Sequence, residues 1–127
     1  MAAKFVSSNL TDKKAIARIT TRDDAISMKT LENGTVIKMC AYVKQEVSKD
    51  MPGTDPETFM SILVLDADGT LYATRSDTFM RKIDEIMELF IDEETGEFPD
   101  ISADPIPIKI TKQTARSGNT FVSCAFV

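Results

Sequence analysis

Histidine and tryptophan are absent from this chain of 127 residues, and cysteine occurs only at Cys40 and Cys124. The absence of histidine excludes zinc sites with His ligands and His-based acid/base or triad catalysis within the chain. No apolar run approaches the roughly 18 residues that a membrane-spanning helix needs. We therefore expect no cofactor, no metal site and no membrane association.

The N-terminal segment and the two cysteines bear on where the protein works. Residues 1–9 contain one lysine and no apolar stretch of signal-peptide length, so we expect no export and a cytoplasmic location. In a reducing compartment, Cys40 and Cys124 are predicted to be free thiols. Both fall in strands that could be neighbours, so the spacing also leaves an oxidised pair open.

Charge is distributed unevenly along the chain. Residues 1–47 hold 8 Lys or Arg against 5 Asp or Glu, residues 48–105 hold 4 against 15, and residues 106–127 hold 3 against none. The corresponding net charges are +3, −11 and +3. Because a polyanion responds to the local field, basic terminal segments are able to form a positive groove although the whole chain is acidic. The alternative is that these are solvated faces that only keep the protein soluble.

The segment 36–47 alternates apolar and polar residues with a period of two, which predicts a strand. One predicted face carries Ile37, Met39, Ala41 and Val43, and the other carries Lys38, Cys40, Tyr42 and Lys44.

A single helix is predicted among further strands. Ser76 is a natural N-cap, Asp77 suits the first turn, and an apolar stripe follows on the segment 77–91. The stripe is formed by Phe79, Ile83, Ile86, Met87 and Phe90. Strands are predicted over residues 58–65, 70–75, 106–111 and 120–127.

The element order, three strands, one helix and two strands, is the layout of the five-stranded Greek-key barrel called the OB-fold, with its helix between strands 3 and 4. We therefore predict an all-β class with one helix. One domain is expected over residues 1–127, in which 1–35 form an N-terminal extension and 36–127 form the barrel.

Residues 64–71, Val-Leu-Asp-Ala-Asp-Gly-Thr-Leu, match the D-x-D-G-T motif of haloacid dehalogenase-like phosphatases, in which the first Asp attacks phosphorus with Mg²⁺ as the cation. That fold places the motif at the start of a doubly wound sheet, whereas about half of this chain precedes it. Asp66 to Gly69 also forms a favoured hairpin turn. A metal-dependent phosphatase centred on these residues is therefore only the third-ranked alternative. The predicted function is non-enzymatic.

Basic and aromatic residues on the predicted strands indicate binding of nucleic acid. Tyrosine rings can stack on bases of any identity, and Lys or Arg can follow the phosphates. Phe59 and Phe121 are compatible with either the core or this surface. The Gly-tipped segment 113–121 joins the last two strands, where the OB-fold has one of its ligand-gripping loops. The predicted contacts are Lys38, Tyr42, Lys44, Tyr72, Arg75, Lys109, Lys112 and Arg116.

Three features of the sequence point to a known family: the element order, the helix between strands 3 and 4, and the pattern from Lys112 to Val127, in which a Ser-Gly turn leads into Phe-Val-Ser-Cys. In these features the chain resembles the OB-fold single-stranded DNA-binding proteins, particularly compact bacteriophage versions. The resemblance covers residues 35–127. It implies a non-enzymatic protein of the host cytoplasm that coats single-stranded DNA, without strong sequence preference, during replication or recombination.

The resemblance also bears on partners. The chain ends within a predicted strand, without the flexible acidic tail of the bacterial housekeeping type, and the acidic segment 92–104 is a candidate to replace that tail in recruiting replication or recombination proteins. Unshielded strand ends are compatible with a homodimer. The second-ranked function is a protein-interaction module on the same fold, which uses the acidic middle segment to contact a basic partner.

Overall fold

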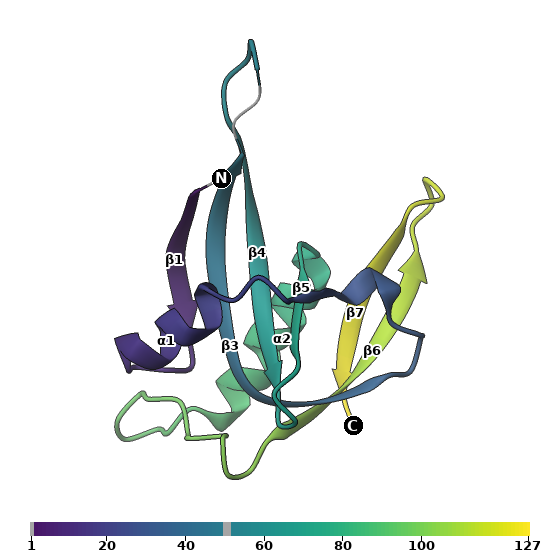
Figure 1. Ribbon diagram of the computed structural model, residues 1–127. Helices are drawn as coiled ribbons and strands as arrows, with labels where there is room; N and C mark the ends of the chain where they lie inside the picture. Colours follow the sequence, from purple (N-terminus) through teal and green to yellow (C-terminus); the bar gives the residue numbers. More distant parts are fainter. Residues whose placement is uncertain (1, 50–51) are drawn as a thin grey trace.

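The computed structural model describes residues 2–49 and 52–127, which are mainly β-structure (Figure 1). In chain order the elements are β1 (Ala2–Ser8), α1 (Lys13–Thr20), β2 (Ile26–Ser27), the 3₁₀ turn η1 (Met28–Thr30), β3 (Val36–Lys49), β4 (Glu57–Asp66), β5 (Leu71–Thr74), α2 (Asp77–Phe90), β6 (Ile106–Thr114) and β7 (Thr120–Phe126).

Seven strands form one curled sheet, in which the order β2-β5-β4-β3-β6-β7 is completed by β1 against β3. Strand β3 pairs with β4 over most of its length. Its other edge is shared, because residues 36–39 pair with β6 and residues 43–48 pair with β1. The strand count is two higher than the predicted five, since β1 and β2 lie in the segment to which the sequence analysis assigned no strand.

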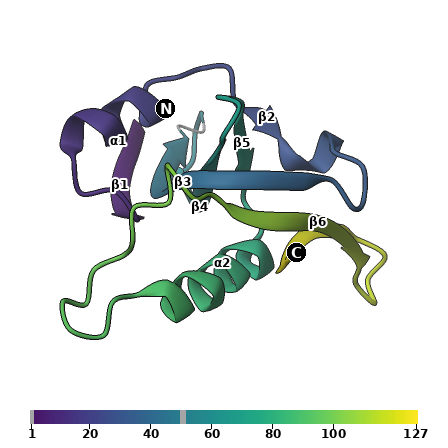
Figure 2. The ribbon, with the colours of Figure 1, turned by 90° about the horizontal axis from the view of Figure 1, so that it is seen from below.

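The two α-helices lie on opposite faces of the sheet (Figure 2). Helix α1 lies where the sequence indicates a helical turn, over residues 12–18, and it extends this turn to Thr20. It begins after Asp12, whose side chain accepts a hydrogen bond from the Lys14 N–H, and it buries Ile19 against β3 and β4. Met28 of η1 is fully buried in the main core. Residues 2–35 therefore contribute to both cores instead of lying outside the fold. No helix among residues 2–49 and 52–127 has the length and apolarity to cross a membrane.

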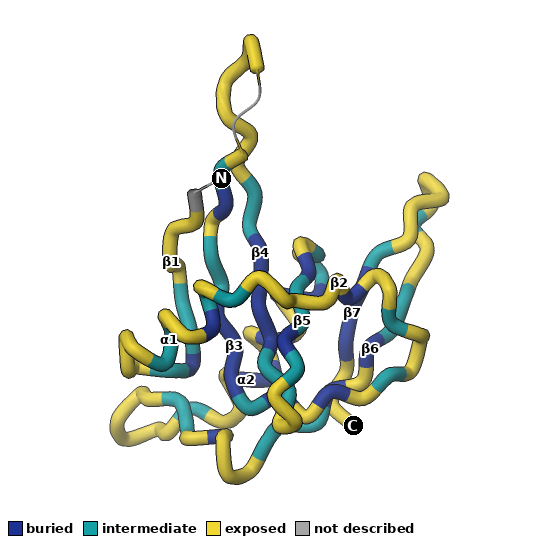
Figure 3. The backbone as a smooth tube through the Cα atoms, viewed as in Figure 1, coloured by how far each residue is buried: buried dark blue, intermediate teal, exposed yellow. Residues whose placement is uncertain are grey.

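Helix α2 is built as its sequence predicts at its N-terminus and over most of its apolar stripe. Ser76 Oγ accepts a hydrogen bond from the Phe79 N–H at 3.2 Å, which is the expected N-cap. Phe79 and Ile83 are fully buried, and they belong to a core that also includes residues of β3, β4, β6 and β7 (Figure 3). Phe90 departs from the prediction, since the last residue of the helix is 41% exposed.

The predicted faces of β3 are wrong beyond Met39 because of a β-bulge. The register between β3 and β4 shifts between Met39 and Ala41, so that Cys40 is an extra residue. Since side chains alternate with a period of two, one inserted residue moves all later side chains to the opposite face. Tyr42 therefore joins Met39 in the core beneath α2, whereas Val43 packs with Ile19 of α1.

Both cysteines are free thiols, as predicted. The Cys40 thiol donates a hydrogen bond to the Leu65 carbonyl at 3.4 Å, and Cys124 is buried in the main core. Burial raises the pKa of the Cys124 thiol to about 12. These are the properties of cysteines that pack as small apolar residues.

Candidate nucleic-acid interface

A groove with a volume of about 660 Å³ crosses the face of the sheet that carries α1. It is lined by β3, β4, β5, β7 and residues 25–29. Figure 1 shows the β3–β4 and β6–β7 hairpins rising on either side of β5. The two hairpins therefore flank the groove, an arrangement that suits an extended chain better than a small enclosed ligand.

Strand alternation places an aromatic ring and a cation together in the groove. Phe59, Ser61 and Leu63 of β4 line it, whereas the intervening residues of β4 face α2. The guanidinium carbon of Arg75 lies 3.6 Å from the centroid of the Phe59 ring. Such a cation–π contact holds both groups in place while the Arg75 side chain stays exposed.

A second aromatic residue reaches the groove from β7. Phe121 is half-buried and lines the groove across from β4 and β5. The hydroxyl of Ser76 donates a hydrogen bond to the Val122 carbonyl, which ties the end of β5 to β7. This contact fixes the side of the groove that carries Phe121 relative to the side that carries Arg75.

The charged residues that line the groove are both basic, although the whole chain carries a net charge of −5. They are Lys29 and Arg75, and none of the described lining residues is acidic. Lys112 lies close by, because its Nζ donates a hydrogen bond to the Lys29 carbonyl at 2.8 Å. The local field in the groove is therefore favourable for phosphate groups.

The same surface continues beyond the groove onto the edge strand β1. Phe5 pairs with Gln45 of β3, which pairs with Ser61 of β4, and residues directly opposite one another project to the same face. Phe5 is 51% exposed. A third aromatic ring therefore lies on this face, two strands away from β4.

Five of the predicted contacts lie in or near the groove, or on an exposed strand surface. Arg75 lines the groove, and Lys112 and Arg116 belong to the neighbouring β6–β7 hairpin. Lys38 and Lys109 are exposed on one face of the β3–β6 pair, as the pairing of Lys38 with Pro107 shows.

Tyr42 does not lie on this surface. Its side chain is 2% exposed, and its ring meets Phe98 edge-on at a centroid distance of 6.4 Å. The bulge at Cys40 is the cause, since a regular strand would have presented Tyr42 on the opposite face. A ring in this position cannot stack on a base without leaving the core.

The burial of Tyr42 is expected to make the protein less stable in alkali. Burial raises the pKa of Tyr42 from 10 to about 12, with the charge of Asp84 adding to the shift. Above pH 10 the unfolded chain releases this proton while the folded chain keeps it, so stability falls as the pH rises from 10 to about 12. Urea unfolding at about pH 9 and about pH 11 should show a smaller loss for Tyr42→Phe than for the wild type. Equal losses would contradict this placement of the hydroxyl.

Lys44 and Tyr72 also lie away from the groove. Lys44 Nζ is 2.6 Å from each carboxylate oxygen of Asp84 on α2, so its charge is already paired. Tyr72 is half-buried and packs against the main core. Burial raises the pKa of Tyr72, and the charges of Asp66 and Asp68 add to the shift.

The D-x-D-G-T motif forms the hairpin turn between β4 and β5. Asp68 Oδ1 accepts a hydrogen bond from the Thr70 N–H at 2.8 Å, and Asp66 Oδ1 accepts one from the Asp68 N–H at 3.2 Å. The bonds from Thr70 lower the pKa of Asp68. Gly69 has a φ of 92°, which a turn of this kind requires.

No group of His, Cys, Asp or Glu able to hold a metal occurs among the described residues. The two carboxylates thus stabilise a turn.

The sequence alone leaves Phe59 and Phe121 undecided and does not single out Phe5 or Lys29. The position of Phe59 follows from the pairing of β4, because residues 59–65 are almost continuously apolar and the sequence does not show which of them face the groove. The positions of Phe5 and Lys29 depend on contacts between segments far apart in the chain, for which the sequence carries no local signal.

An open groove with aromatic rings, basic side chains and a hairpin on each side is characteristic of proteins that bind single-stranded nucleic acids. Residues 5–126 match the family described as phage single-stranded DNA-binding protein, of the Phi29 type. Because this match covers nearly the whole chain, the protein belongs to that family. No match was found among curated proteins or among solved structures.

Proposed function

We propose that the protein coats single-stranded DNA during phage DNA replication or recombination, without sequence preference and without catalysing a reaction. Family membership supports the DNA-binding part of this proposal. The groove supports the lack of sequence preference, because stacking on phenylalanine rings and contact with phosphates are open to every base. The proposed place of action is the cytoplasm of the host.

The observation that carries the proposal is the position of the groove in the sheet. We interpret β3, β4, β5, β6 and β7, with α2 after the third of them, as the five strands and the helix of an OB-fold. The strand order β5-β4-β3-β6-β7 supports this interpretation. In OB-folds the second and third strands and two loops bind oligonucleotides. Here these strands are β4 and β5, which line the groove, and the loops are those of the two flanking hairpins.

On this interpretation the chain is one domain, in which residues 36–127 form the barrel and residues 1–35 pack on it. The first 35 residues then add to the DNA-binding surface, since Lys29 and Phe5 belong to them.

The proposed DNA path runs across the strands from Phe121 to Phe59 and on to Phe5. Two strand separations, about 10 Å, divide β4 from β1, so the rings are placed for different bases of one strand. Phosphates are contacted by Lys29, Arg75, Lys112 and Arg116 along the groove, and by Lys38 and Lys109 on the adjoining face. Tyr42, Lys44 and Tyr72 have no part in this path.

The proposed function is tested by the fluorescence anisotropy of labelled oligo-dT, titrated with the protein at low and at moderate salt. The proposal predicts salt-sensitive binding that duplex DNA of equal length does not displace. Displacement by duplex at equal concentration, or no binding at low salt, would contradict it.

Arg75→Ala is expected to lower the salt dependence of this binding by about one unit in the slope of log K against log salt, because one phosphate contact is lost. Lys29→Ala should act in the same way. Lys44→Ala is the matched control, since Lys44 is already paired with Asp84 and lies on the other face. A slope that falls equally in all three variants would indicate a general charge effect in place of a groove contact.

A further inference from the structure

An exposed apolar patch lies at the C-terminal end of α2, away from the groove. Leu89 is 84% exposed, Phe90 41% and Phe126 54%. The rings of Phe90 and Phe126 contact each other at a centroid distance of 6.2 Å. Large apolar side chains gathered on a surface often mark a site of protein interaction.

A small pocket adjoins these two rings. Its volume is about 210 Å³, and its apolar walls include Phe90, Ile101, Ile106 and Phe126. Asp100 and Asp104 also line it. The pocket therefore combines an apolar interior with two carboxylates, which suits one bulky apolar side chain with cationic neighbours.

The surroundings of the pocket are strongly acidic. Residues 83–108 contain nine Asp or Glu and no Lys or Arg. Asp84 pairs with Lys44 and Glu85 with Lys82, whereas no ion pair of the other seven occurs among the described residues. Uncompensated charge of this density repels DNA and attracts cations.

The acidic loop is held in shape by its own hydrogen bonds. The Asp92 N–H donates to the Glu97 carbonyl at 2.9 Å, and the Gly96 N–H donates to the Asp92 carbonyl at 2.8 Å. The Ser102 hydroxyl donates to Asp100 Oδ1 at 2.6 Å. The loop therefore loses less conformational entropy when a partner binds than an unstructured loop would.

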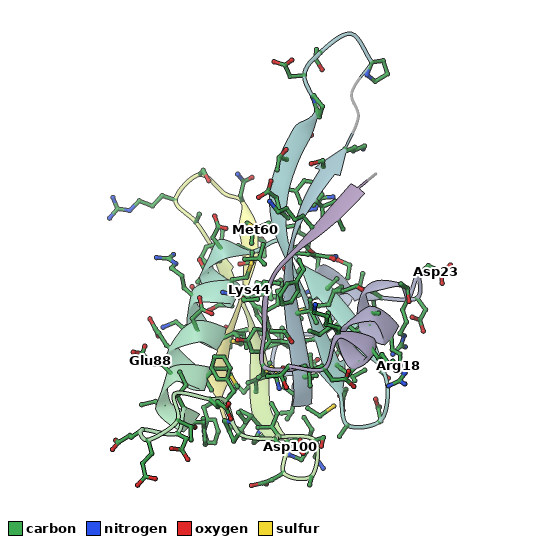
Figure 4. All side chains as sticks on the ribbon, turned by 90° about the vertical axis from the view of Figure 1, so that its left-hand side faces the viewer. Arg18, Asp23, Lys44, Met60, Glu88 and Asp100 are labelled. Carbon is green, nitrogen blue, oxygen red and sulfur yellow. The ribbon has the colours of Figure 1, made fainter. Side chains whose placement is uncertain are left out.

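The patch and the groove lie on opposite sides of the sheet. Figure 4 shows Glu88 on the α2 side of the sheet and Asp100 below the end of the sheet, whereas Arg18 and Asp23 lie across the sheet from Glu88. A partner on the α2 side leaves the groove on the α1 side open.

We propose that this patch, formed by Phe90, Phe126 and the pocket beside them, docks a segment of another protein in which Lys or Arg residues flank one bulky apolar side chain. The pocket accepts the apolar side chain, and the acidic rim binds the cations. Docking and DNA binding take place at the same time, so the protein carries its partner on the coated strand.

The test uses two labelled peptides of equal charge, one with a single phenylalanine between lysines and one with glycine in its place. Fluorescence anisotropy measures their affinity for the full chain, with and without saturating oligo-dT. The phenylalanine peptide is expected to bind about tenfold more tightly, because burial of one bulky apolar side chain is worth at least that factor. Phe90→Ala should remove this preference. Oligo-dT should leave both affinities unchanged.

The acidic rim is tested with Asp100→Asn/Asp104→Asn, which should weaken binding of both peptides. Its matched control, Asp23→Asn/Glu32→Gln, removes the same charge from exposed positions outside the patch. Equal weakening in both double variants, equal affinity for the two peptides, or competition by oligo-dT would overturn the proposal. A wild-type dimer that Phe90→Ala converts to a monomer in sedimentation would also overturn it, because a second copy would then cover the patch. Oligo-dT affinity, measured on the same samples, tests the proposed function separately.

Discussion

Phe59→Ala is expected to weaken binding of oligo-dT by about 5-fold to 150-fold, because stacking of one base on an aromatic ring contributes about 1–3 kcal/mol. The variant also removes the ring against which Arg75 is held. The slope of log K against log salt should change little, since no charge is lost. Fluorescence anisotropy over a series of salt concentrations measures both quantities.

Two comparisons make this result specific to the groove. Phe121→Ala should weaken binding in the same way, because Phe121 lines the opposite side. Phe90→Ala should leave it unchanged, since Phe90 is an exposed ring on the α2 side. Wild-type affinity for oligo-dT in both groove variants would show that Phe59 and Phe121 do not stack on bases.

Tyr42→Ala is expected to lower the free energy of unfolding by about 3–5 kcal/mol, the range for replacing a buried aromatic residue with alanine. The reason is that Tyr42 fills the core between β3 and α2, where it contacts Phe98. Urea unfolding followed by circular dichroism measures the change. Tyr42→Phe, which keeps the ring, should bind oligo-dT with wild-type affinity.

The structure thus gives Tyr42 a role in the core, whereas the sequence indicated that its ring stacks on bases. If the ring stacked on DNA, Tyr42→Ala would fold with wild-type stability and lose affinity. That combination of results would show that β3 has no bulge at Cys40, and the description of the sheet would be wrong at that point.

The features predicted well from the sequence are those that depend on neighbouring residues. Ser76 caps α2 because its hydroxyl lies three residues before the Phe79 N–H that it must reach, and this spacing is visible in the chain. The turn at residues 66–69 is equally local. The strand at residues 58–65 is also found as predicted, within β4 (Glu57–Asp66), although its almost continuous apolar run does not show which residues face the groove.

The features missed depend on pairing between distant segments. The bulge at Cys40 reflects the register of β3 against β4, and a strict period of two placed Tyr42 and Lys44 on the wrong face. Strand β1 was not predicted because its stability comes from pairing with residues 43–48 of β3. The proposed contribution of Phe5 to the DNA-binding surface follows only from that pairing.

The uneven charge of the chain was informative once it was divided along the sequence. The last segment, residues 106–127, has three basic residues and no acidic one, and it forms the hairpin beside the groove. The acidic residues 83–108 lie mostly on α2 and in the loop that follows it. What the sequence could not give is that the basic groove and the acidic helix α2 lie on opposite sides of one sheet, which lets a protein with a net charge of −5 present a positive surface to a polyanion.

The central claim, that single-stranded DNA lies in the groove on the α1 side of the sheet, is tested most directly by nuclear magnetic resonance. Backbone amide signals of the isotopically labelled protein would be followed during titration with a short oligo-dT. The account predicts that the largest shifts occur at Phe59, Arg75 and Phe121 and extend to Phe5, while α2 and residues 92–104 change little. Shifts concentrated on α2 and the acidic loop, with an unchanged groove, would contradict it.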